Sequence, residues 1–431
     1  MKVTFLGAGS TVFSKNVLGD IIYTPEIKDI DIALYDIDEQ RLEDSYRMLS
    51  NILGNSGRKD VTLRKYTDRL QALTGADFVV NAVQVGGYKP CTVTDFEVPK
   101  KFGLRQTIAD TLGIGGIFRA LRTIPVMQEF ASDMEKVCPD ALLLNYTNPM
   151  GMLTGYMLRY TGVKTVGLCH SVQACASELL KLLGMEGKLP GLRWKIAGIN
   201  HQAWLLEIED SKGVDLYPEI KERAKSAESD LVRLELMKHF GYYITESSEH
   251  NAEYGPYFIK SRYPELIDRF KIPLDEYPRR CVEQINGWAK MREQLVDNTA
   301  LTHTLSHEFA APIIKAVITD VPFRIHGNVI NNGLITNLPS NACVEVPVMV
   351  DRNGLNPCRV GELPEQCAAL NRTNINVQLL AIEAAVTLKK DAIYQAAMLD
   401  PHTAAELSLD DIRLMCDELI EAHGNWLPKF N

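Results

Sequence analysis

From the N-terminus to about residue 190, short apolar runs alternate with longer stretches in which apolar residues recur every three or four positions. The apolar runs lie at 2–6, 29–38, 76–87, 141–149 and 164–171. The helical spacing is clearest at 10–22, 39–53, 116–137 and 172–183. Strands and helices that alternate in this way predict a parallel sheet with helices on both faces.

Beyond residue 190 the pattern changes. The stretch 193–210 reads as a strand pair with Gly198 between the strands, 327–354 reads as antiparallel strands, and 374–423 is largely helical. We therefore expect an α/β protein with two domains: a Rossmann-like, doubly wound parallel sheet over 1–195, and an α+β substrate and oligomerisation domain over 196–431. No low-complexity linker separates them, so we also expect an extensive interface with a cleft.

Composition narrows the class of protein. The chain has 431 residues, of which 46% are hydrophobic and 23% charged, as in soluble globular proteins. A net charge of -9 argues against nucleic acid or an anionic membrane as partner. No apolar run is long enough to span a bilayer, and the N-terminus lacks the pattern of a signal peptide. The 9 cysteines have no close spacing and their number is odd, so we expect reduced thiols, a cytoplasmic protein and a small-molecule substrate.

A glycine turn follows the first predicted strand. Gly7, Gly9 and Ser10 lie between that strand and a helix, which is the context of a dinucleotide-binding turn. Val12 occupies the place of the third glycine of the usual motif, so an ordinary strand-to-helix turn remains an alternative. Asp36 ends the second strand, where an acid would accept hydrogen bonds from ribose hydroxyls and favour NAD. Asn81 follows a later strand at the same edge of the sheet.

Cys169, His170 and His201 are candidate metal ligands because each follows a predicted strand. A thiolate and an imidazole can bind a divalent ion and leave positions open for substrate oxygens. Adjacent side chains on an extended strand point in opposite directions, so Cys169 and His170 should not both bind one ion. Taken alone, a cysteine beside a histidine is more often a buried residue next to a surface residue.

Several motifs occur in a fixed order: GAGS, NAVQVGGY, RQTIADTLGIGGIFRALRTIP, LNYTNPM, GLCHS and AGINHQAW. In this order they resemble the NAD- and metal-dependent glycosidases of glycoside hydrolase family 4. Later motifs resemble the α-galactosidase (melibiase) branch; they read ESSEHNAEYGPYF, DEYPRRC, NGLITNLPSNACVEVP and ALNRTNINVQ. The resemblance covers almost the whole chain. It implies a lactate/malate dehydrogenase-like fold and the hydrolysis of α-galactosides of the melibiose or raffinose type.

The reaction that the resemblance implies is a redox elimination. NAD takes a hydride from carbon 3 of the sugar, which makes the proton on carbon 2 acidic. A base removes that proton, the glycosidic bond breaks by elimination, water adds, and the carbonyl is reduced again. The family is thus an exception to hydrolysis by two carboxylates.

The resemblance also implies roles for single residues. Cys169 and His201 would hold a divalent ion, manganese or another, that polarises the oxygens on carbons 2 and 3. Asn148 would contact the sugar near this ion. Tyr254 is our candidate for the base, with Tyr257 as the alternative. Asp110 would tune or orient that base.

Two departures from the phosphosugar branch of the family bear on the substrate. His170 stands where that branch has an aspartate acting as general acid, and a histidine can donate a proton to the leaving oxygen. The stretch KPCTVTDF lacks the arginine with which that branch would clamp a phosphate, so a neutral galactoside fits better. Arg280 is a candidate for binding sugar hydroxyls, although paired arginines are more often salt-bridge residues.

Other functions remain open from the sequence. Within the family, α-glucosidase and α-glucuronidase activity are alternatives, because the pocket shape that reads one hydroxyl is not visible in a sequence. A 2-hydroxyacid dehydrogenase would need an arginine for its substrate carboxylate and has no use for a metal site. A nucleotide-binding protein without turnover would gain nothing from His201, Cys169 and a nearby tyrosine. The resemblance further implies a homodimer or homotetramer.

Overall fold

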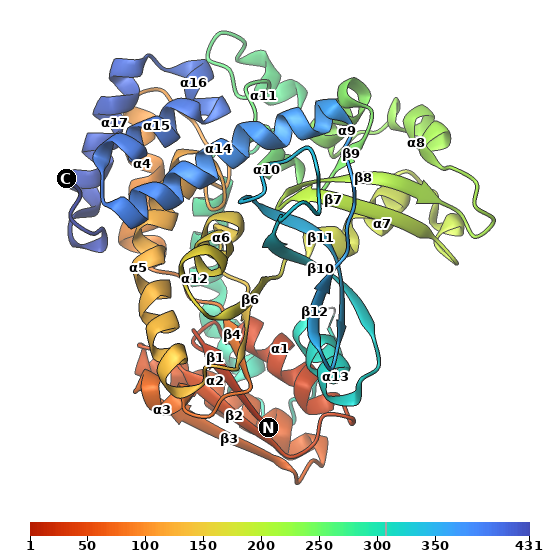
Figure 1. The fold of residues 1–431 in the computed structure, drawn as a ribbon, viewed down its shortest axis with the longest axis vertical. Coiled ribbons are helices and arrows are strands. Elements are labelled where there is room, and N and C mark those ends of the chain that lie inside the picture. Colours follow the sequence, from red (N-terminus) through yellow and green to blue (C-terminus); the bar gives the residue numbers. More distant parts are fainter. Residues whose placement is uncertain (307) are drawn as a thin grey trace.

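The protein is built on one twisted sheet that changes from parallel to antiparallel along its width (Figure 1). The structure, a computed structural model, describes residues 1–306 and 308–431. In the parallel part the strand order is β3-β2-β1-β4-β5-β6. These strands are β1 (Lys2–Leu6), β2 (Ile30–Tyr35), β3 (Val61–Tyr66), β4 (Phe78–Asn81), β5 (Leu142–Asn145) and β6 (Lys164–Gly167).

Helices cover both faces of the parallel part because its central strands are apolar on both sides. On one face, Phe78 and Val80 pack in a core with α1 (Thr11–Tyr23) and α2 (Glu39–Ser56). On the other face, Val79 packs in a second core with α5 (Gly113–Val137) and α6 (Met150–Tyr160). The helix α7 (Ser171–Leu182) follows β6 and packs against β8 in the antiparallel part.

The antiparallel part continues the sheet in the order β10-β11-β7-β8-β9, with β12 paired to β11. These strands are β7 (Arg193–Ile199), β8 (Gln202–Glu209), β9 (Tyr243–Ile244), β10 (Phe323–Ile330), β11 (Cys343–Asp351) and β12 (Gly354–Pro357). At two points, which we call the seams, neighbouring strands share only one residue pair: Gly167 pairs with Asn328, and Gly198 with Glu345. A side chain at either glycine would lie within 3 Å of atoms of neighbouring residues, so glycine permits the close approach there.

The C-terminal helices return to the parallel part. The long helix α14 (Glu365–Thr387) packs on α5 and α6 and also contacts β7, crossing one end of the molecule in Figure 1. The remaining helices are α3 (Arg69–Leu73), α4 (Val93–Lys101), α8 (Tyr217–Ala224), α9 (Leu231–Phe240), α10 (Ser248–Glu253), α11 (Glu265–Arg269), α12 (Glu276–Leu295), α13 (Ala310–Thr319), α15 (Lys390–Leu399), α16 (Pro401–Glu406) and α17 (Leu409–His423), with short turns at η1 (Gly87–Thr92), η2 (Glu186–Lys188) and η3 (Gly424–Trp426). Within 1–306 and 308–431, none of the helices combines the length and the apolar character that crossing a bilayer requires.

The predicted fold class is confirmed, with three local differences. The strand β3 was not predicted, because its exposed positions give it no apolar run. The predicted strand over 76–87 ends at Asn81, where a glycine-rich loop begins. The strand β6 ends at Gly167, so Cys169 and His170 lie in the loop that enters α7 and the argument from strand alternation does not apply to them. The proposed division between residues 195 and 196 falls inside β7 and stays a prediction.

Candidate active site

The carboxyl ends of the parallel strands form one row. Leu6 is in register with Tyr35 and Asn81, Asn81 with Asn145, and Asn145 with Gly167. The loops that leave these strands therefore begin at the same edge of the sheet. This edge is where open parallel sheets bind their ligands.

The glycine turn at this edge packs closely against neighbouring residues. Gly7 has φ 87°, and a Cβ there would lie 2.9 Å from the backbone carbonyl of Ala82. Gly9 donates its N–H to Oδ2 of Asp36 over 2.6 Å, which fixes the acid beside the turn. Ser10 precedes α1, and its side chain makes no capping hydrogen bond, so it leaves the first N–H groups of that helix to other acceptors. The turn thus fits a pyrophosphate at a helix N-terminus.

Asn81 is not exposed at this edge of the sheet. Its side chain is fully buried, and its Nδ2 donates to Oδ1 of Asn145 over 2.9 Å. The following loop contains Gly86 and Gly87, which both have positive φ. Arg122 donates its Nε–H to the carbonyl of Val85 and so holds this loop in place.

Three side chains from separate segments meet beside the seams. One ligand atom each of Cys169, His201 and Glu246 lies within 4.8 Å of the others. Nε2 of His201 is 3.4 Å from Oε2 of Glu246. Burial would lower the pKa of His201, but Glu246, Cys169 and Asp110 outweigh it and raise that pKa to about 10. The cluster therefore attracts positive charge strongly, as a cation site must.

A tight turn presents His201 to this cluster. Ile199 pairs with Gln202 across the β7–β8 hairpin, so Asn200 and His201 form the turn, and His201 adopts φ 64°. A left-handed conformation of this kind usually belongs to glycine, and it costs about 1–2 kcal/mol in other residues. Strained residues of this kind are concentrated at functional sites, and here the strained residue places an imidazole in the cluster.

Tyr254 lies directly behind the cluster. It is almost completely buried, and its Oη is 2.9 Å from Nδ1 of His201. Burial, with Asp110, Glu253 and Glu246, raises the pKa of Tyr254 well above its ordinary value. Tyr257, by contrast, is 45% exposed, and its ring lies against Phe240 and Phe258.

Asp110 and Asn148 adjoin Tyr254. Nδ2 of Asn148 donates to Oδ2 of Asp110 over 3.3 Å, and Nε2 of His250 lies 3.6 Å from Oδ1. Burial opposes ionisation of Asp110, but His250, Arg119 and His201 prevail and hold its pKa well below the ordinary value. The acid is therefore a carboxylate at neutral pH.

Glu253 fastens the loop that carries Asp110. Its carboxylate accepts N–H groups from Thr107 and Ala109, each over 2.7 Å, and lies 3.3 Å from that of Ile108. Because Glu253 directly precedes Tyr254, the same contact sets the acid and the tyrosine opposite each other.

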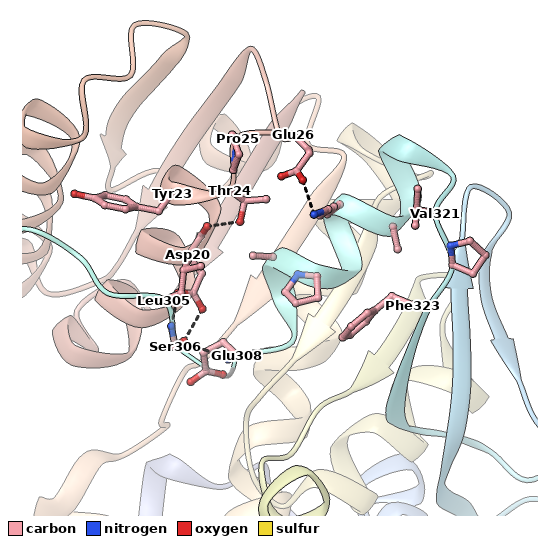
Figure 2. Close-up of a pocket in the computed structure, with 15 residues that line it drawn as sticks. Asp20, Tyr23, Thr24, Pro25, Glu26, Leu305, Ser306, Glu308, Val321 and Phe323 are labelled. Carbon is pink, nitrogen blue, oxygen red and sulfur yellow. Dashed lines mark hydrogen bonds and ion pairs between the residues drawn. The ribbon is translucent and has the colours of Figure 1, made fainter. Parts of the chain in front are cut away.

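His170 belongs to a different contact. Its Nε2 lies 2.7 Å from Oε2 of Glu308, and this contact, despite partial burial, raises the pKa of His170. Glu308 also lines a pocket of about 520 Å³ between α1 and α13. Figure 2 shows Glu308 beside Ser306 at one end of this pocket. The Cys169–His201–Glu246 cluster does not line this pocket, so the pocket is not our candidate for the sugar site.

Arg280 lies at the rim of the site, on α12. Its Nε is 2.6 Å from Oε1 of Glu276, and one guanidinium nitrogen is 3.8 Å from Glu249. The sequence left two roles open for Arg280, binding sugar hydroxyls or forming a salt bridge, and the structure shows the salt bridge.

Several residues of the site were not predicted from the sequence: Glu246, His250, Glu253, Glu308 and Arg119. Glu246, His250 and Glu253 lie in the motif that contains Tyr254, where three acids and a histidine are close together. Glu308 lies far along the chain from His170, which it contacts, so no local spacing could have identified it. Arg119 lies in the same motif as Asp110, whose pKa it lowers, but nothing in the motif marks it out from the neighbouring arginines.

Comparisons with known proteins cover nearly the whole chain. The sequence model of the Family 4 glycosyl hydrolase matches residues 2–185, and that of the Family 4 glycosyl hydrolase C-terminal domain matches residues 196–403. The chain is 62% identical to an alpha-galactosidase of Bacillus subtilis (strain 168), over 100% of this chain and 99% of that protein.

Two solved structures have a similar fold. One is a 6-phospho-alpha-glucosidase from gut microorganisms in complex with NAD and Mn2+, with 21% identity, a TM-score of 0.83, and 100% and 99% of the two chains covered. The other is the malate dehydrogenase of Cryptosporidium parvum, with 14% identity, a TM-score of 0.55, and 89% and 98% covered. The predicted likeness to dehydrogenases is thus confirmed for the fold.

Proposed function

This chain belongs to the family 4 glycosyl hydrolases, and on that premise we propose that it hydrolyses α-galactosides with the help of NAD and a divalent metal ion. The observation that carries the proposal is the contact between Tyr254 and His201 inside a metal-type cluster, at the edge of a sheet with a dinucleotide-type turn. The full-length identity of 62% to an alpha-galactosidase supports the substrate class.

The residues fit both groups. Gly7, Gly9, Ser10 and Asp36 would hold NAD, because Ser10 leaves the first N–H groups of α1 uncapped and Gly9 holds the Asp36 carboxylate beside the turn. Bound NAD would supply an acceptor for the hydride of sugar carbon 3 and return it at the end of the reaction. Cys169 and His201 would hold the ion, manganese or another, which would supply a Lewis acid to the oxygens on carbons 2 and 3.

Tyr254 is our candidate for the base that takes the proton from carbon 2. When Nε2 of a histidine binds an ion, the ring proton sits on Nδ1. His201 would then donate its Nδ1–H to Oη of Tyr254, 2.9 Å away, and favour the phenolate that accepts the proton. Asp110 acts in the opposite sense, because its negative charge raises the pKa of the phenol and makes the oxygen more basic. The structure therefore supports Tyr254 over Tyr257.

His170 is our candidate for the general acid at the leaving oxygen. It is half exposed, its Nε2 is held by Glu308 at 2.7 Å, and among residues 1–306 and 308–431 no hydrogen bond engages its Nδ1. Glu308 raises the pKa of His170 and so favours the imidazolium, whose second N–H is the proton to donate. Glu308 thus does for His170 what an orienting carboxylate does in other acid–base pairs.

The sugar would lie between Asn148 and the rim of the site. Asn148 is already held by Asp110, so the orientation of its amide is set. Arg280 is held by Glu276 through its Nε, so only its terminal N–H groups would remain for sugar hydroxyls, which makes it the weaker of the two candidates. Asn81 would act on the cofactor through its loop, since its side chain is buried.

We also propose a reducing, cytoplasmic setting and assembly into homodimers or homotetramers. A Cys169 thiol that was oxidised could no longer bind an ion. Among the described residues, Leu305, Val321 and Phe323 are exposed apolar side chains around the pocket of Figure 2, a surface that a second copy could cover.

One experiment tests the function. Hydrolysis of a p-nitrophenyl α-galactoside is measured with NAD, manganese and a thiol reductant, each omitted in turn. We expect activity to require all three, and solvent deuterium to appear at carbon 2 of the product. Full activity without NAD or metal would refute the mechanism, whereas a preference for the α-glucoside would change only the substrate.

A further inference from the structure

We propose that Glu246 is a third protein ligand of the divalent ion, so that the site offers one sulfur, one nitrogen and one oxygen. The proposal rests on the proposed function, which needs such an ion, and goes beyond the pair Cys169 and His201 to which the sequence pointed. It is carried by the position of the carboxylate, the bracing of the backbone around it, and the lack of a better partner.

The carboxylate lies within reach of one ion. All three ligand atoms fall within 4.8 Å of one another, and Oε2 of Glu246 is 3.4 Å from Nε2 of His201. Bonds from a divalent ion to sulfur, nitrogen and oxygen are about 2.0–2.3 Å long, so neighbouring ligands of one ion lie roughly 3 Å apart. A nitrogen and an oxygen at 3.4 Å have the separation of adjacent ligands.

The backbone holds Glu246 in a conformation that it would not adopt by itself. Its φ is 65°, in the left-handed region. Thr245, the residue before it, is tied to Ala203 in both directions: Thr245 N–H donates to the Ala203 carbonyl over 2.8 Å, and Ala203 N–H donates to Thr245 Oγ1 over 3.1 Å. Because Ala203 is two residues from His201, this pairing sets Glu246 beside the imidazole.

The backbone that follows Glu246 is also held by hydrogen bonds. Nδ2 of Asn251 donates to the carbonyls of Thr245 and Ser247, over 2.9 and 3.1 Å, and so spans Glu246. Ser247 in turn caps α10 by accepting an N–H from His250. Left-handed residues other than glycine persist only where the surroundings fix them in this way, and such residues are concentrated at functional sites.

Among the described residues, no lysine or arginine forms a salt bridge with Glu246. Its side-chain contacts are two histidines, His201 and His250, each at 3.4 Å, and a backbone hydrogen bond from Ser247 helps to lower its pKa. His250 has a nearer partner of its own, because its Nδ1 is 2.9 Å from Oγ of Ser247. The carboxylate thus retains lone pairs that face the cluster.

A third ligand would also explain how a cysteine–histidine pair could favour a hard ion. Thiolate and imidazole suit zinc, whereas carboxylate oxygens suit manganese and magnesium. Adding one carboxylate moves the site toward manganese and still leaves positions open for two substrate oxygens and water. Removing it should therefore change both the affinity for manganese and the preference over zinc.

The test measures binding of the metal alone, without sugar. Purified full-length wild type, Glu246→Gln, Glu246→Asp and the control Glu249→Gln are titrated with Mn2+ under reducing conditions, and free Mn2+ is followed by electron paramagnetic resonance. The control removes a carboxylate from the first turn of α10 that faces Arg280 instead of the cluster. Competition with Zn2+ then gives the preference between the two ions.

We expect Glu246→Gln to weaken Mn2+ binding at least tenfold and to weaken Zn2+ binding less, with Glu246→Asp in between and Glu249→Gln like the wild type. Thermal unfolding of the metal-free variants checks that the chain folds, and if Glu246→Gln does not, the conservative Glu246→Asp decides. Equal Mn2+ affinity in the wild type and the folded variants overturns the third ligand and leaves the proposed function intact. A wild type that binds no divalent ion overturns both proposals.

Discussion

Two regions of the candidate site contain backbone with positive φ, and they differ in the residues that adopt it. One is the glycine turn in the parallel part of the sheet, and the other surrounds the Cys169–His201–Glu246 cluster. In the parallel half, the sharp turn after β1 is made by Gly7, with φ 87°. Around the Cys169–His201–Glu246 cluster, positive φ occurs in residues with side chains: His201 at 64°, Glu246 at 65° and Ala109, next to Asp110, at 53°. Glycine adopts this conformation freely, whereas other residues do so at a cost of about 1–2 kcal/mol.

The difference follows from what each half must offer. A dinucleotide turn works through backbone N–H groups, so the absence of a side chain is an advantage there. The candidate catalytic centre works through an imidazole, a thiolate and carboxylates, so the side chain must be kept and the strain accepted. Strain in the second half is therefore expected to accompany chemistry, and glycine in the first half to accompany binding. Four predictions test this contrast.

The largest effect should come from Tyr254→Phe. This change keeps the ring and removes only the oxygen that contacts His201. Loss of a general base lowers kcat by about 10²–10⁴-fold. We also expect solvent deuterium to disappear from carbon 2 of any product formed. Tyr257→Phe, at a 45% exposed position outside the cluster, is the matched control and should keep wild-type kcat. If the two variants behave alike, Tyr254 is not the base.

The same contrast explains how far the sequence could lead. The parallel half was predictable because each of its elements has a local pattern: an apolar run, a glycine turn, an amphipathic helix. The candidate site was predictable only in part. Cys169, His201 and Tyr254 were named with the help of resemblance, and the structure brings them together. Glu246 and Glu308 were not, because what places them is the pairing of β8 with β9 and the packing of α13, which no local spacing records.

The second prediction concerns the glycine side. In Gly7→Ala, the new Cβ would lie 2.9 Å from the carbonyl of Ala82 at a φ of 87°. The left-handed conformation and the overpacking together should lower the free energy of unfolding by about 2–4 kcal/mol and weaken NAD binding. Gly54→Ala, within α2 where a Cβ meets nothing within 4 Å, should instead stabilise the protein by about 0.5–1 kcal/mol. Chemical denaturation with and without NAD measures both.

The third prediction concerns a buried charge at a seam. Glu345 is fully buried opposite Gly198, and one hydrogen bond from Asn328 reaches its carboxyl group. Burial raises its pKa from 4.5 to about 7, although His201 and Asn328 oppose this. Because the folded-state pKa is the higher one, the unfolded chain loses its proton first. The contribution of protonated Glu345 to the free energy of unfolding is therefore complete below pH 4.5 and is lost as the pH rises to about 7.

Glu345→Gln removes this loss. Metal-free Glu345→Gln should unfold with nearly wild-type free energy at pH 4.5 and be more stable than the wild type at pH 8, by up to about 3 kcal/mol. Urea unfolding at the two pH values checks this. Glu207→Gln, at an exposed position on β8, should show no such dependence. A variant less stable than the wild type at pH 8 would mean that Glu345 is held as a carboxylate by contacts stronger than those described.

The fourth prediction has the smallest expected effect. It tests the contrast most directly, because it concerns the sign of the difference in free energy of unfolding between a glycine and an alanine variant. At most positions glycine is less stable than alanine by about 0.5–1 kcal/mol. At His201, with φ 64°, the order should reverse: metal-free His201→Gly should exceed His201→Ala by roughly 1 kcal/mol in free energy of unfolding, although neither binds the ion. At the next residue, Gln202, the first residue of β8, glycine should be the less stable of the two. If alanine is as stable as glycine at position 201, the hairpin turn stores no strain there, and its conformation needs no functional explanation.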